Sequence, residues 1–269
     1  MRGSKCIVAL LFALGCIIGF GHPKILIYDD EGVDPQSLAD TIQFFKNNTR
    51  PFCYRIQTIT SQELCQTSWE RRTKLLVFPG GRDILYDRRL RGPGCKKIKA
   101  FVHNGGCYLG ICAEAYFAGQ KVVFAPGTDL EVIEDRELGF FPGITLGPIL
   151  PAYTYGSEAG SCAARLHFKP LNTEFFTYYN GGGTFVPQKA QNYKVLATYS
   201  DADNLPAIVQ CSVGKGIAIL SGVHFECDLE ALRHYTDTPK KTEAIIRAIQ
   251  STDAQQTGAT QWILKALRL

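Results

Sequence analysis

Residues 107–119 read CYLGICAEAYFAG. The apolar run at 107–111 is typical of a buried strand, and the segment 113–119 suits a helix. Cys112 is therefore predicted to lie at a strand-to-helix turn. Free backbone N–H groups and the positive end of the helix there would lower the thiol pKa and hold an oxyanion. The alternative is a small buried hydrophobe, but the glycine and small residues around Cys112 favour a nucleophile.

The same alternation of apolar runs and helical segments precedes this stretch. Runs at 24–28, 54–59 and 74–78 are predicted to be strands, with helical spacing of apolar residues between them. Short apolar strands alternating with helices indicate an α/β fold with a parallel sheet covered on both faces. Because ligands bind at the carboxyl ends of such strands, a site is expected at residues 79–81 and at Cys112.

The second half of the chain is predicted to contain more strands and loops. Apolar runs at 207–211 and 217–221 are joined by a glycine-containing turn, which predicts a hairpin. Helices are expected at 242–249 and 261–269. No internal repeat or linker-like composition divides the chain.

The sequence His224-Phe225-Glu226 follows the hairpin and supplies a candidate base. In an extended chain His224 and Glu226 project to the same side, so the carboxylate can fix the imidazole tautomer. A single histidine is more often a packed or surface residue than a catalyst, but Glu226 and the Cys112 turn favour catalysis. Cys112, His224 and Glu226 are therefore the predicted nucleophile, base and orienting carboxylate.

Two glycine-rich segments are candidate walls of the same site. Pro79-Gly80-Gly81 would let backbone N–H groups approach a ligand beside Cys112, although an ordinary turn is an equal alternative. Residues 178–183 read YYNGGG and look like a loop folded against a substrate, with a flexible hairpin as the alternative.

Together these residues resemble the class I glutamine amidotransferase-like superfamily, in which a cysteine at a strand-to-helix turn and a late His-x-Glu form a triad. Within it, the chain is similar to the family named for the N-terminal domain of biotin–protein ligase. The motifs that carry the resemblance are PGG at 79–81, GICA at 110–113 with AY at 115–116, FPG at 141–143 with GP at 147–148, YYNGGG at 178–183 with Phe185, and GVHFE at 222–226.

The resemblance implies a flavodoxin-like three-layer sandwich with a mostly parallel central sheet, and thioester chemistry at Cys112. It does not imply biotin ligation, because no segment resembles the ligase's catalytic domain or its adenylate loop. The expected backbone donors of the oxyanion hole are Gly80, Gly81 and Ala113. The expected substrate-binding residues are Glu114, Tyr116, Tyr179, Asn180, Gly181 and Gly182.

The sequence departs from classical amidotransferases beside the nucleophile. Those enzymes carry glycine two residues after the cysteine and glutamine two further on, where this chain has Glu114 and Tyr116. Free glutamine is therefore not the expected substrate. A carboxylate at Glu114 would also raise the pKa of the Cys112 thiol unless a cation or the imidazolium offsets it. Ala113 argues against the intracellular-protease branch, which has histidine directly after the cysteine.

Three functions are consistent with this reading. The first is an exported cysteine hydrolase or amidotransferase-like enzyme, acting through a thioester at Cys112 on an amide or ester of a small molecule or peptide. The second is a catalytically inactive binding module on the same fold. The intact triad favours the first, whereas Glu114 and the cysteine-rich, exported setting favour the second. An anchored interaction protein is a third alternative, supported only by the leader. No metal or organic cofactor is expected.

Composition excludes some classes of protein. The 269 residues are 45% hydrophobic and 20% charged, which is typical of a globular protein. The formal net charge of +4 is too small to indicate a nucleic-acid partner. The chain is expected to divide into a leader at 1–22, one amidotransferase-like domain at 23–250 and a C-terminal helical tail at 251–269.

The leader has the layout of a secretory signal peptide. Arg2 and Lys5 precede an apolar run at 6–20, which is shorter than the roughly 20 residues that span a bilayer. Export to the periplasm or the exterior is expected, with an uncleaved membrane anchor as the alternative and no other stable membrane span. In an oxidising compartment some of the eight later cysteines are expected to form disulfides.

Overall fold

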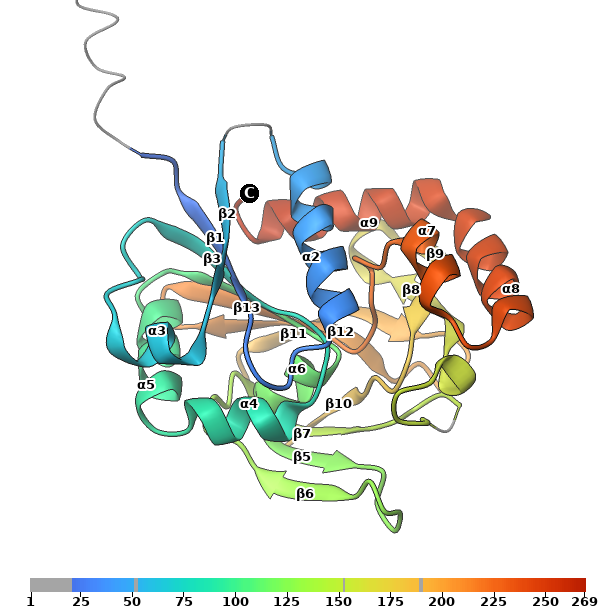
Figure 1. Ribbon diagram of the computed structural model, residues 1–269, viewed down its shortest axis with the longest axis horizontal. Coiled ribbons are helices and arrows are strands. Elements are labelled where there is room, and N and C mark those ends of the chain that lie inside the picture. Colours follow the sequence, from blue (N-terminus) through green and yellow to red (C-terminus); the bar gives the residue numbers. More distant parts are fainter. Residues whose placement is uncertain (1–20, 51–52, 152, 189–190) are drawn as a thin grey trace, which may run out of the picture.

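The structure is a computed structural model that describes residues 21–50, 53–151, 153–188 and 191–269. Two β-sheets form its framework (Figure 1). The larger has the order β2-β1-β3-β4-β13-β12-β11-β8-β9. Its strands are Arg55–Ile59 (β2), Lys24–Tyr28 (β1), Thr73–Phe78 (β3), Cys107–Ile111 (β4), Gly216–Ser221 (β13), Pro206–Val213 (β12), Tyr193–Tyr199 (β11), Cys162–Phe168 (β8) and Thr173–Tyr179 (β9).

The smaller sheet has the order β10-β7-β5-β6. Its strands are Thr184–Pro187 (β10), Phe141–Gly147 (β7), Gly119–Phe124 (β5) and Val132–Asp135 (β6). The helices are Pro35–Asn48 (α2), Ser61–Gln66 (α3), Asp83–Leu90 (α4), Pro93–His103 (α5), Ala113–Phe117 (α6), Leu229–Tyr235 (α7), Pro239–Gln250 (α8) and Asp253–Ala266 (α9), with short 3-10 turns at Glu158–Gly160 and Lys169–Leu171.

The large sheet is mixed. Strands β2, β1, β3, β4 and β13 are parallel, and β12, β11, β8 and β9 extend the sheet through antiparallel pairs. The four strands predicted in the first half are confirmed, because their bounds agree with β1 to β4 to within one residue. The hairpin at 206–221 is confirmed as well. Antiparallel pairing follows from such short connections, since a parallel neighbour needs a long crossover.

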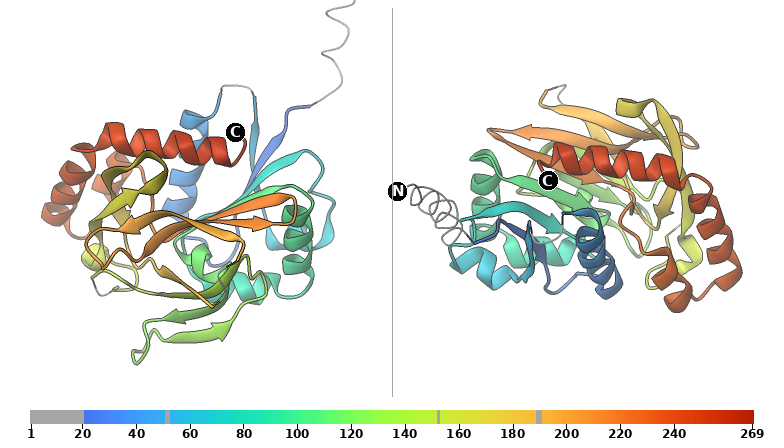
Figure 2. Two further views of the ribbon diagram at one scale, coloured as in Figure 1. Left: turned by 180° about the vertical axis from the view of Figure 1, so that it is seen from behind. Right: turned by 90° about the horizontal axis from the view of Figure 1, so that it is seen from above.

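Helices cover both faces of the large sheet (Figure 2). Alternate residues of β1 point to opposite sides. Ile25 and Ile27 pack in the core beneath α2 and α9, whereas Leu26 and Tyr28 pack in the core beneath α3 to α6. The covering of both faces leaves the carboxyl edge of the parallel strands as the open side, and this is where the candidate site lies.

The C-terminal segment belongs to the same core as the sheet. Residues 251–269 were expected to form a helical tail beyond the domain. In the structure α9 places Ile263 and Leu264 in the core beneath α2, and Leu267 follows them. Helices α7 and α8 form a smaller cluster against strand β9, around Tyr178.

Helix α6 is shorter than the sequence predicted. The helix expected at 113–119 ends at Phe117, and Gly119 already begins strand β5. Gly119 pairs with Phe141 of β7, and a Cβ atom at this glycine would lie 2.8 Å from the Thr145 hydroxyl. Pairing with the small sheet therefore ends the helix early.

The predicted leader lies almost wholly outside the described residues, which begin at Gly21. None of the helices within the described ranges is long and apolar enough to cross a membrane. The eight cysteines from Cys53 to Cys227 are all free thiols, so the expected disulfides are not seen among the described residues.

Candidate active site

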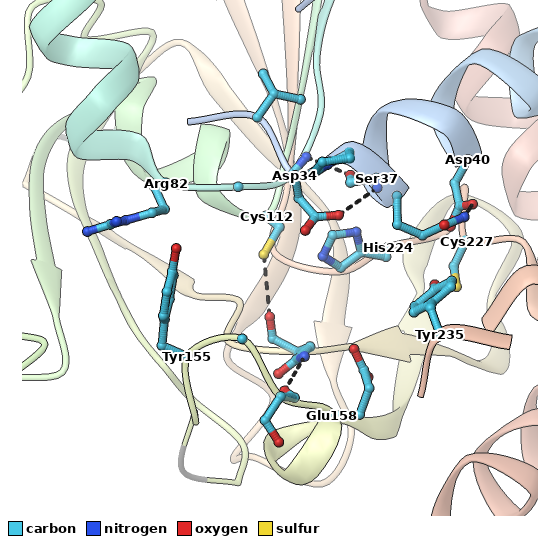
Figure 3. Close-up of a pocket in the computed structure, with 18 of the residues that line it drawn as sticks. Asp34, Ser37, Asp40, Arg82, Cys112, Tyr155, Glu158, His224, Cys227 and Tyr235 are labelled. Atoms are coloured by element: carbon cyan, nitrogen blue, oxygen red, sulfur yellow. Dashed lines mark hydrogen bonds between the residues drawn. The ribbon is translucent and has the colours of Figure 1, made fainter. Parts of the chain in front are cut away.

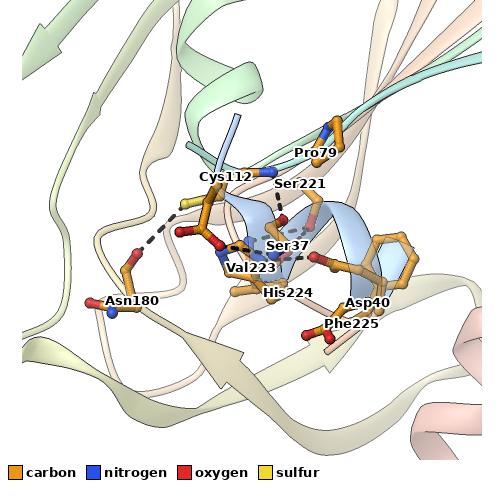
Figure 4. A network of polar contacts seen from close by, with 12 residues as sticks. Ser37, Asp40, Pro79, Cys112, Asn180, Ser221, Val223, His224 and Phe225 are labelled. Atoms are coloured by element: carbon orange, nitrogen blue, oxygen red, sulfur yellow. Dashed lines mark hydrogen bonds and ion pairs between the residues drawn. The ribbon is translucent and has the colours of Figure 1, made fainter. Parts of the chain in front are cut away.

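Cys112 lies on a strained turn between β4 and α6. Its φ of 55° and ψ of −103° are backbone values that residues other than glycine seldom adopt. The turn is fixed because the Cys112 N–H donates to the Ser221 carbonyl oxygen at 2.7 Å (Figure 4). The Ala115 N–H also donates to the Cys112 carbonyl oxygen. Because α6 has only five residues, its dipole contributes less than the free N–H groups at its start.

His224 is oriented by Glu226. Its Nδ1 lies 2.8 Å from Glu226 Oε1, and the Glu226 side chain is only 1% exposed. The His224 N–H donates to the Tyr178 carbonyl oxygen at 2.9 Å, which joins the segment to strand β9. The sequence argument assumed an extended chain here, but Phe225 and Glu226 form a turn. The carboxylate reaches the ring through this turn rather than by strand alternation.

The environment of His224 favours the imidazolium form. Burial lowers its pKa, but the charges of Cys112 and Glu226 and hydrogen bonds to both raise the pKa well above its usual value. Cys112 and His224 lie next to each other in the same pocket (Figure 3). A thiol beside a histidine held by a carboxylate can form a thiolate–imidazolium pair, the reactive form of a nucleophilic cysteine.

One of the three expected oxyanion donors is already occupied. The Gly80 N–H donates to Ser37 Oγ at 2.8 Å, so it does not face a ligand. The N–H groups of Gly81 and Ala113 donate no hydrogen bond within the described part of the chain, and both residues line space beside Cys112. The structure therefore corrects the expectation for Gly80 and leaves Gly81 and Ala113 as candidate donors.

The absence of a side chain at Gly80 allows a close approach to His224 and Cys112. A Cβ atom there would lie 2.7 Å from His224 Cε1 and 3.6 Å from Cys112 Cβ. Only glycine therefore lets the β3 turn approach the imidazole and the thiol this closely.

Ser37 was missed by the sequence analysis. It lies in the first turn of α2, where Asp34 accepts the Ser37 N–H at 2.8 Å as the helix N-cap. Aspartate followed directly by Pro35 was a readable helix start. Nothing local indicated that the Ser37 hydroxyl would reach the β3 turn, because that contact joins segments 43 positions apart.

The glycine-rich loop after β9 forms the opposite wall. The Cys112 thiol lies 3.6 Å from the Asn180 carbonyl oxygen, and Asn180 lines the pocket. The Tyr116 hydroxyl donates to the Gly181 carbonyl oxygen at 3.1 Å. Gly181 has a φ of 77°, and a Cβ there would lie 2.5 Å from the Tyr153 ring. Asn180, Gly181 and Tyr116 thus line the cavity beside Cys112.

Two residues expected to bind substrate, Tyr179 and Gly182, lie away from the open space. The Tyr179 hydroxyl accepts the N–H groups of Ile149 and Leu150 and donates to the Gly182 carbonyl oxygen at 2.8 Å. A Cβ at Gly182 would lie 1.7 Å from the Gly222 carbonyl oxygen. Tyr179 and Gly182 therefore shape the loop and are absent from the cavity walls.

Glu114 points into the core beneath the site. It is fully buried, and neither carboxyl oxygen has a hydrogen-bond partner in the described residues. Burial, and secondarily the charge of Asp83, raises its pKa well above its usual value, although Arg136 acts in the opposite direction. A neutral Glu114 removes the expected objection that a carboxylate beside Cys112 would suppress the thiolate.

Two cavities meet at Cys112. The larger cavity has a volume of about 670 Å³ and runs between the start of α2 and the loop before β8. The smaller cavity has a volume of about 290 Å³ and extends toward strands β5 and β6.

The fold and the site define an α/β protein with a candidate nucleophilic cysteine at the carboxyl edge of a parallel sheet. The chain matches the family described as "Biotin-protein ligase, N terminal" over residues 23–269, and it belongs to that family. The resemblance inferred from the sequence motifs is thus confirmed.

Two relatives are similar in sequence over about three quarters of this chain. An uncharacterized protein from Chlamydia muridarum is 37% identical over 209 residues, which cover 76% of this chain and 80% of that protein. A biotin–protein ligase from Schizosaccharomyces pombe is 37% identical over 216 residues, which cover 77% of this chain and 34% of the yeast protein, so the chain spans about a third of that ligase. A solved β-galactosidase from Bacillus circulans covers 90% of this chain and 32% of its own, with 11% identity and a TM-score of 0.48. That likeness supports no functional argument.

Proposed function

We propose that this chain is a class I glutamine amidotransferase-like protein, built on a flavodoxin-like three-layer sandwich, that cleaves or transfers an amide or ester through a thioester at Cys112. The order β2-β1-β3-β4-β13, with all five strands parallel, supports the fold assignment. In doubly wound sheets of this order the ligand lies where the strand order reverses, between β1 and β3. Ser37, Gly81 and Cys112 surround that point.

The single observation that carries the proposal is the Cys112–His224–Glu226 arrangement. Cys112 lies on a strained turn with free N–H groups beside it, and Glu226 Oε1 holds His224 Nδ1 at 2.8 Å. Binding alone requires neither the turn nor the buried carboxylate. Both are what thioester chemistry requires.

The chemistry proceeds in two halves. His224 takes the thiol proton, the Cys112 thiolate attacks the substrate carbonyl carbon, and the N–H groups of Gly81 and Ala113 hold the resulting oxyanion. The tetrahedral intermediate collapses, and His224 gives its proton to the leaving amine or alcohol, which leaves an acyl group on Cys112. Water or an acceptor amine then attacks the thioester while His224 takes its proton. Release of the acid or new amide returns that proton to the thiol.

The test measures alkylation of Cys112 by iodoacetamide across pH, with mass-spectrometric quantification of the Cys112 peptide. The exposed thiol of Cys53 serves as the internal control in every sample. We expect Cys112 to react below about pH 7, and His224→Ala to slow that reaction without changing Cys53. An activated ester should leave a stable acyl mass on Cys112 in the His224→Ala variant. A Cys112 that is inert in the wild-type protein would instead indicate a binding module.

A further inference from the structure

The thiol lies between two cavities rather than at the end of one. Both the larger and the smaller cavity include Cys112 in their walls, and each continues away from it in a different direction. The residues common to both walls are Gly81, Arg82, Cys112, Tyr153, Tyr155 and Asn180. A substrate with its carbonyl carbon at the sulfur therefore has space on both sides of the reacting bond.

The larger cavity favours a positively charged group. Four carboxylates line it, namely those of Asp34, Asp40, Glu158 and Asp237. Within the described residues the basic side chains in its wall are Arg82 and His224. His224 is paired with Glu226, and the Arg82 guanidinium lies over the Tyr155 ring, 4.9 Å from its centroid (Figure 3).

Aromatic residues add to this preference. The rings of Tyr153, Tyr155, Tyr178 and Tyr235 also line the larger cavity. Carboxylates combined with aromatic faces bind ammonium and guanidinium groups. The negative charge of the carboxylates is a property of this cavity wall and not of the whole chain, which carries a net charge of +4. An excess of carboxylates in the wall of an otherwise basic protein indicates a cationic ligand.

The smaller cavity has a different lining. Ile84, Leu130 and Val132 line it together with the rings of Tyr116 and Phe124. Its volume of about 290 Å³ suits one apolar side chain or ring. Three carboxylates also line it. That of Asp83 is paired with the buried Arg136, and those of Asp129 and Glu131 lie in the exposed segment before β6.

We propose that the substrate is an internal amide or ester, with an apolar group on one side of the reacting bond and a basic group on the other. The apolar group occupies the smaller cavity, and an ammonium or guanidinium group occupies the larger cavity near Glu158. This inference rests on the proposed function for the reaction itself. A primary carboxamide has no group beyond its nitrogen and would leave one cavity empty, so it is the poorer substrate.

The first experiment maps the cavities without relying on turnover. Methanethiosulfonate reagents convert the Cys112 thiolate into a mixed disulfide and release methanesulfinate, and they are available with a benzyl or a cationic aminoethyl group. Val132→Trp fills the smaller cavity, and its control Ile133→Trp places the same ring on the neighbouring residue, which is 47% exposed and lines neither cavity. Glu158→Gln removes one charge from the larger cavity, and its control is the exposed Glu174→Gln.

The expected result is a crossed pattern. Val132→Trp slows benzyl labelling of Cys112 about tenfold and leaves aminoethyl labelling within about twofold. Glu158→Gln slows aminoethyl labelling about threefold to tenfold, less so at high salt, and leaves benzyl labelling unchanged. Neither control changes either rate. If both reagents respond equally to both variants, or to neither, the inference is overturned.

The second experiment separates this inference from the proposed function. The substrates are dipeptides of phenylalanine and lysine, in both orders, with an acetyl group at one end and a methylamide at the other. They are compared with analogues in which uncharged norleucine replaces lysine, and with acetylated primary amides of the same residues. We expect cleavage of one order, with a loss of about tenfold or more in kcat/KM for its norleucine analogue. Equal turnover of the primary amides overturns the inference and leaves the proposed function standing. A crossed labelling pattern without any turnover or acyl-enzyme leaves the cavity assignment standing and overturns the proposed function.

Discussion

Ser37 Oγ accepts a hydrogen bond from the Gly80 N–H at 2.8 Å, which ties the start of α2 to the turn after β3. The Gly80 carbonyl oxygen in turn accepts the Asp34 N–H at 3.0 Å and the Tyr86 hydroxyl at 3.1 Å. In a trans peptide the next N–H points opposite to the carbonyl. These contacts therefore direct the Gly81 N–H away from α2 and toward the space beside Cys112.

Ser37→Ala should weaken catalysis without weakening binding. Loss of the hydroxyl frees the Gly80 peptide, so the Gly81 N–H is less well placed for the oxyanion. We expect kcat for ester hydrolysis to fall about tenfold, KM to stay within about twofold, and the free energy of unfolding to drop by about 1 kcal/mol. Ser37→Thr keeps the hydroxyl and should restore most of kcat. A rise in KM at unchanged kcat would assign Ser37 to substrate binding instead.

Glu226→Gln should shift the pH dependence of Cys112 alkylation. Burial lowers the pKa of His224, whereas Cys112 and Glu226 raise it, with a net increase. Without the Glu226 charge the imidazolium loses its proton at lower pH and supports less thiolate. We expect alkylation of Cys112 at pH 6.5 to slow about tenfold, and the difference from wild type to shrink as pH rises.

The same variant tests stability. Because the folded pKa of His224 lies above its unfolded value, its contribution to stability is complete below about pH 6.5 and is lost as pH rises through the folded pKa. Glu226→Gln should move this loss to lower pH in urea unfolding measurements. Glu230→Gln is the matched control, since it removes a nearby charge that pairs with Arg233 rather than with the imidazole. Identical profiles for Glu226→Gln and wild type would contradict the assignment.

Gly80→Ala should inactivate the site while the protein remains folded. The new Cβ would lie 2.7 Å from His224 Cε1 and 3.1 Å from Ser37 Oγ, so the imidazole must move. We expect acylation of Cys112 to fall about a hundredfold and stability to fall by about 1 to 2 kcal/mol. Gly258 lies in helix α9, and a Cβ there would have one described neighbour outside the helix's own backbone within 4 Å, Leu171 Cδ1 at 3.6 Å. The control Gly258→Ala should be fully active and up to about 1 kcal/mol more stable. Full activity in Gly80→Ala would show that the imidazole tolerates the displacement.

The sequence predicted the parallel half of the fold because its signals are local. Strands β1 and β4 are fully buried or nearly so, and such strands appear as short continuous apolar runs between turn residues. The Cys112 turn was predictable for the same reason, since an apolar strand ends there among small residues. Asn180 and Gly181 were located by the glycines that follow them.

Long-range contacts set the features that were not predicted. The pairing of β8 with β11 and of β5 with β7 depends on contacts between segments far apart in the chain, which no local pattern records. Gly80 was assigned as an oxyanion donor because the sequence does not show that Ser37 takes its N–H. The direction of a side chain in a five-residue helix was equally hidden, and Glu114 is the clearest example.

Glu114→Gln should make the protein relatively more stable as pH rises. Burial raises the folded pKa of Glu114 well above the unfolded value of about 4.3, so between these values the folded state binds more protons than the unfolded state. Wild-type stability therefore falls as pH rises through this window, whereas glutamine has the same shape and no proton to lose. We expect the difference in unfolding free energy between variant and wild type to increase by about 1 kcal/mol or more from pH 5 to pH 8.5 in urea titrations. Glu31→Gln, at an exposed carboxylate paired with Arg89, is the control and should show no such increase.

Cys112 alkylation should stay within about twofold in Glu114→Gln, because the carboxyl group that glutamine replaces is already neutral. A large change in alkylation with no change in the pH dependence of stability would mean that Glu114 is ionised beside the thiol, and the assignment of this residue to the core would be wrong.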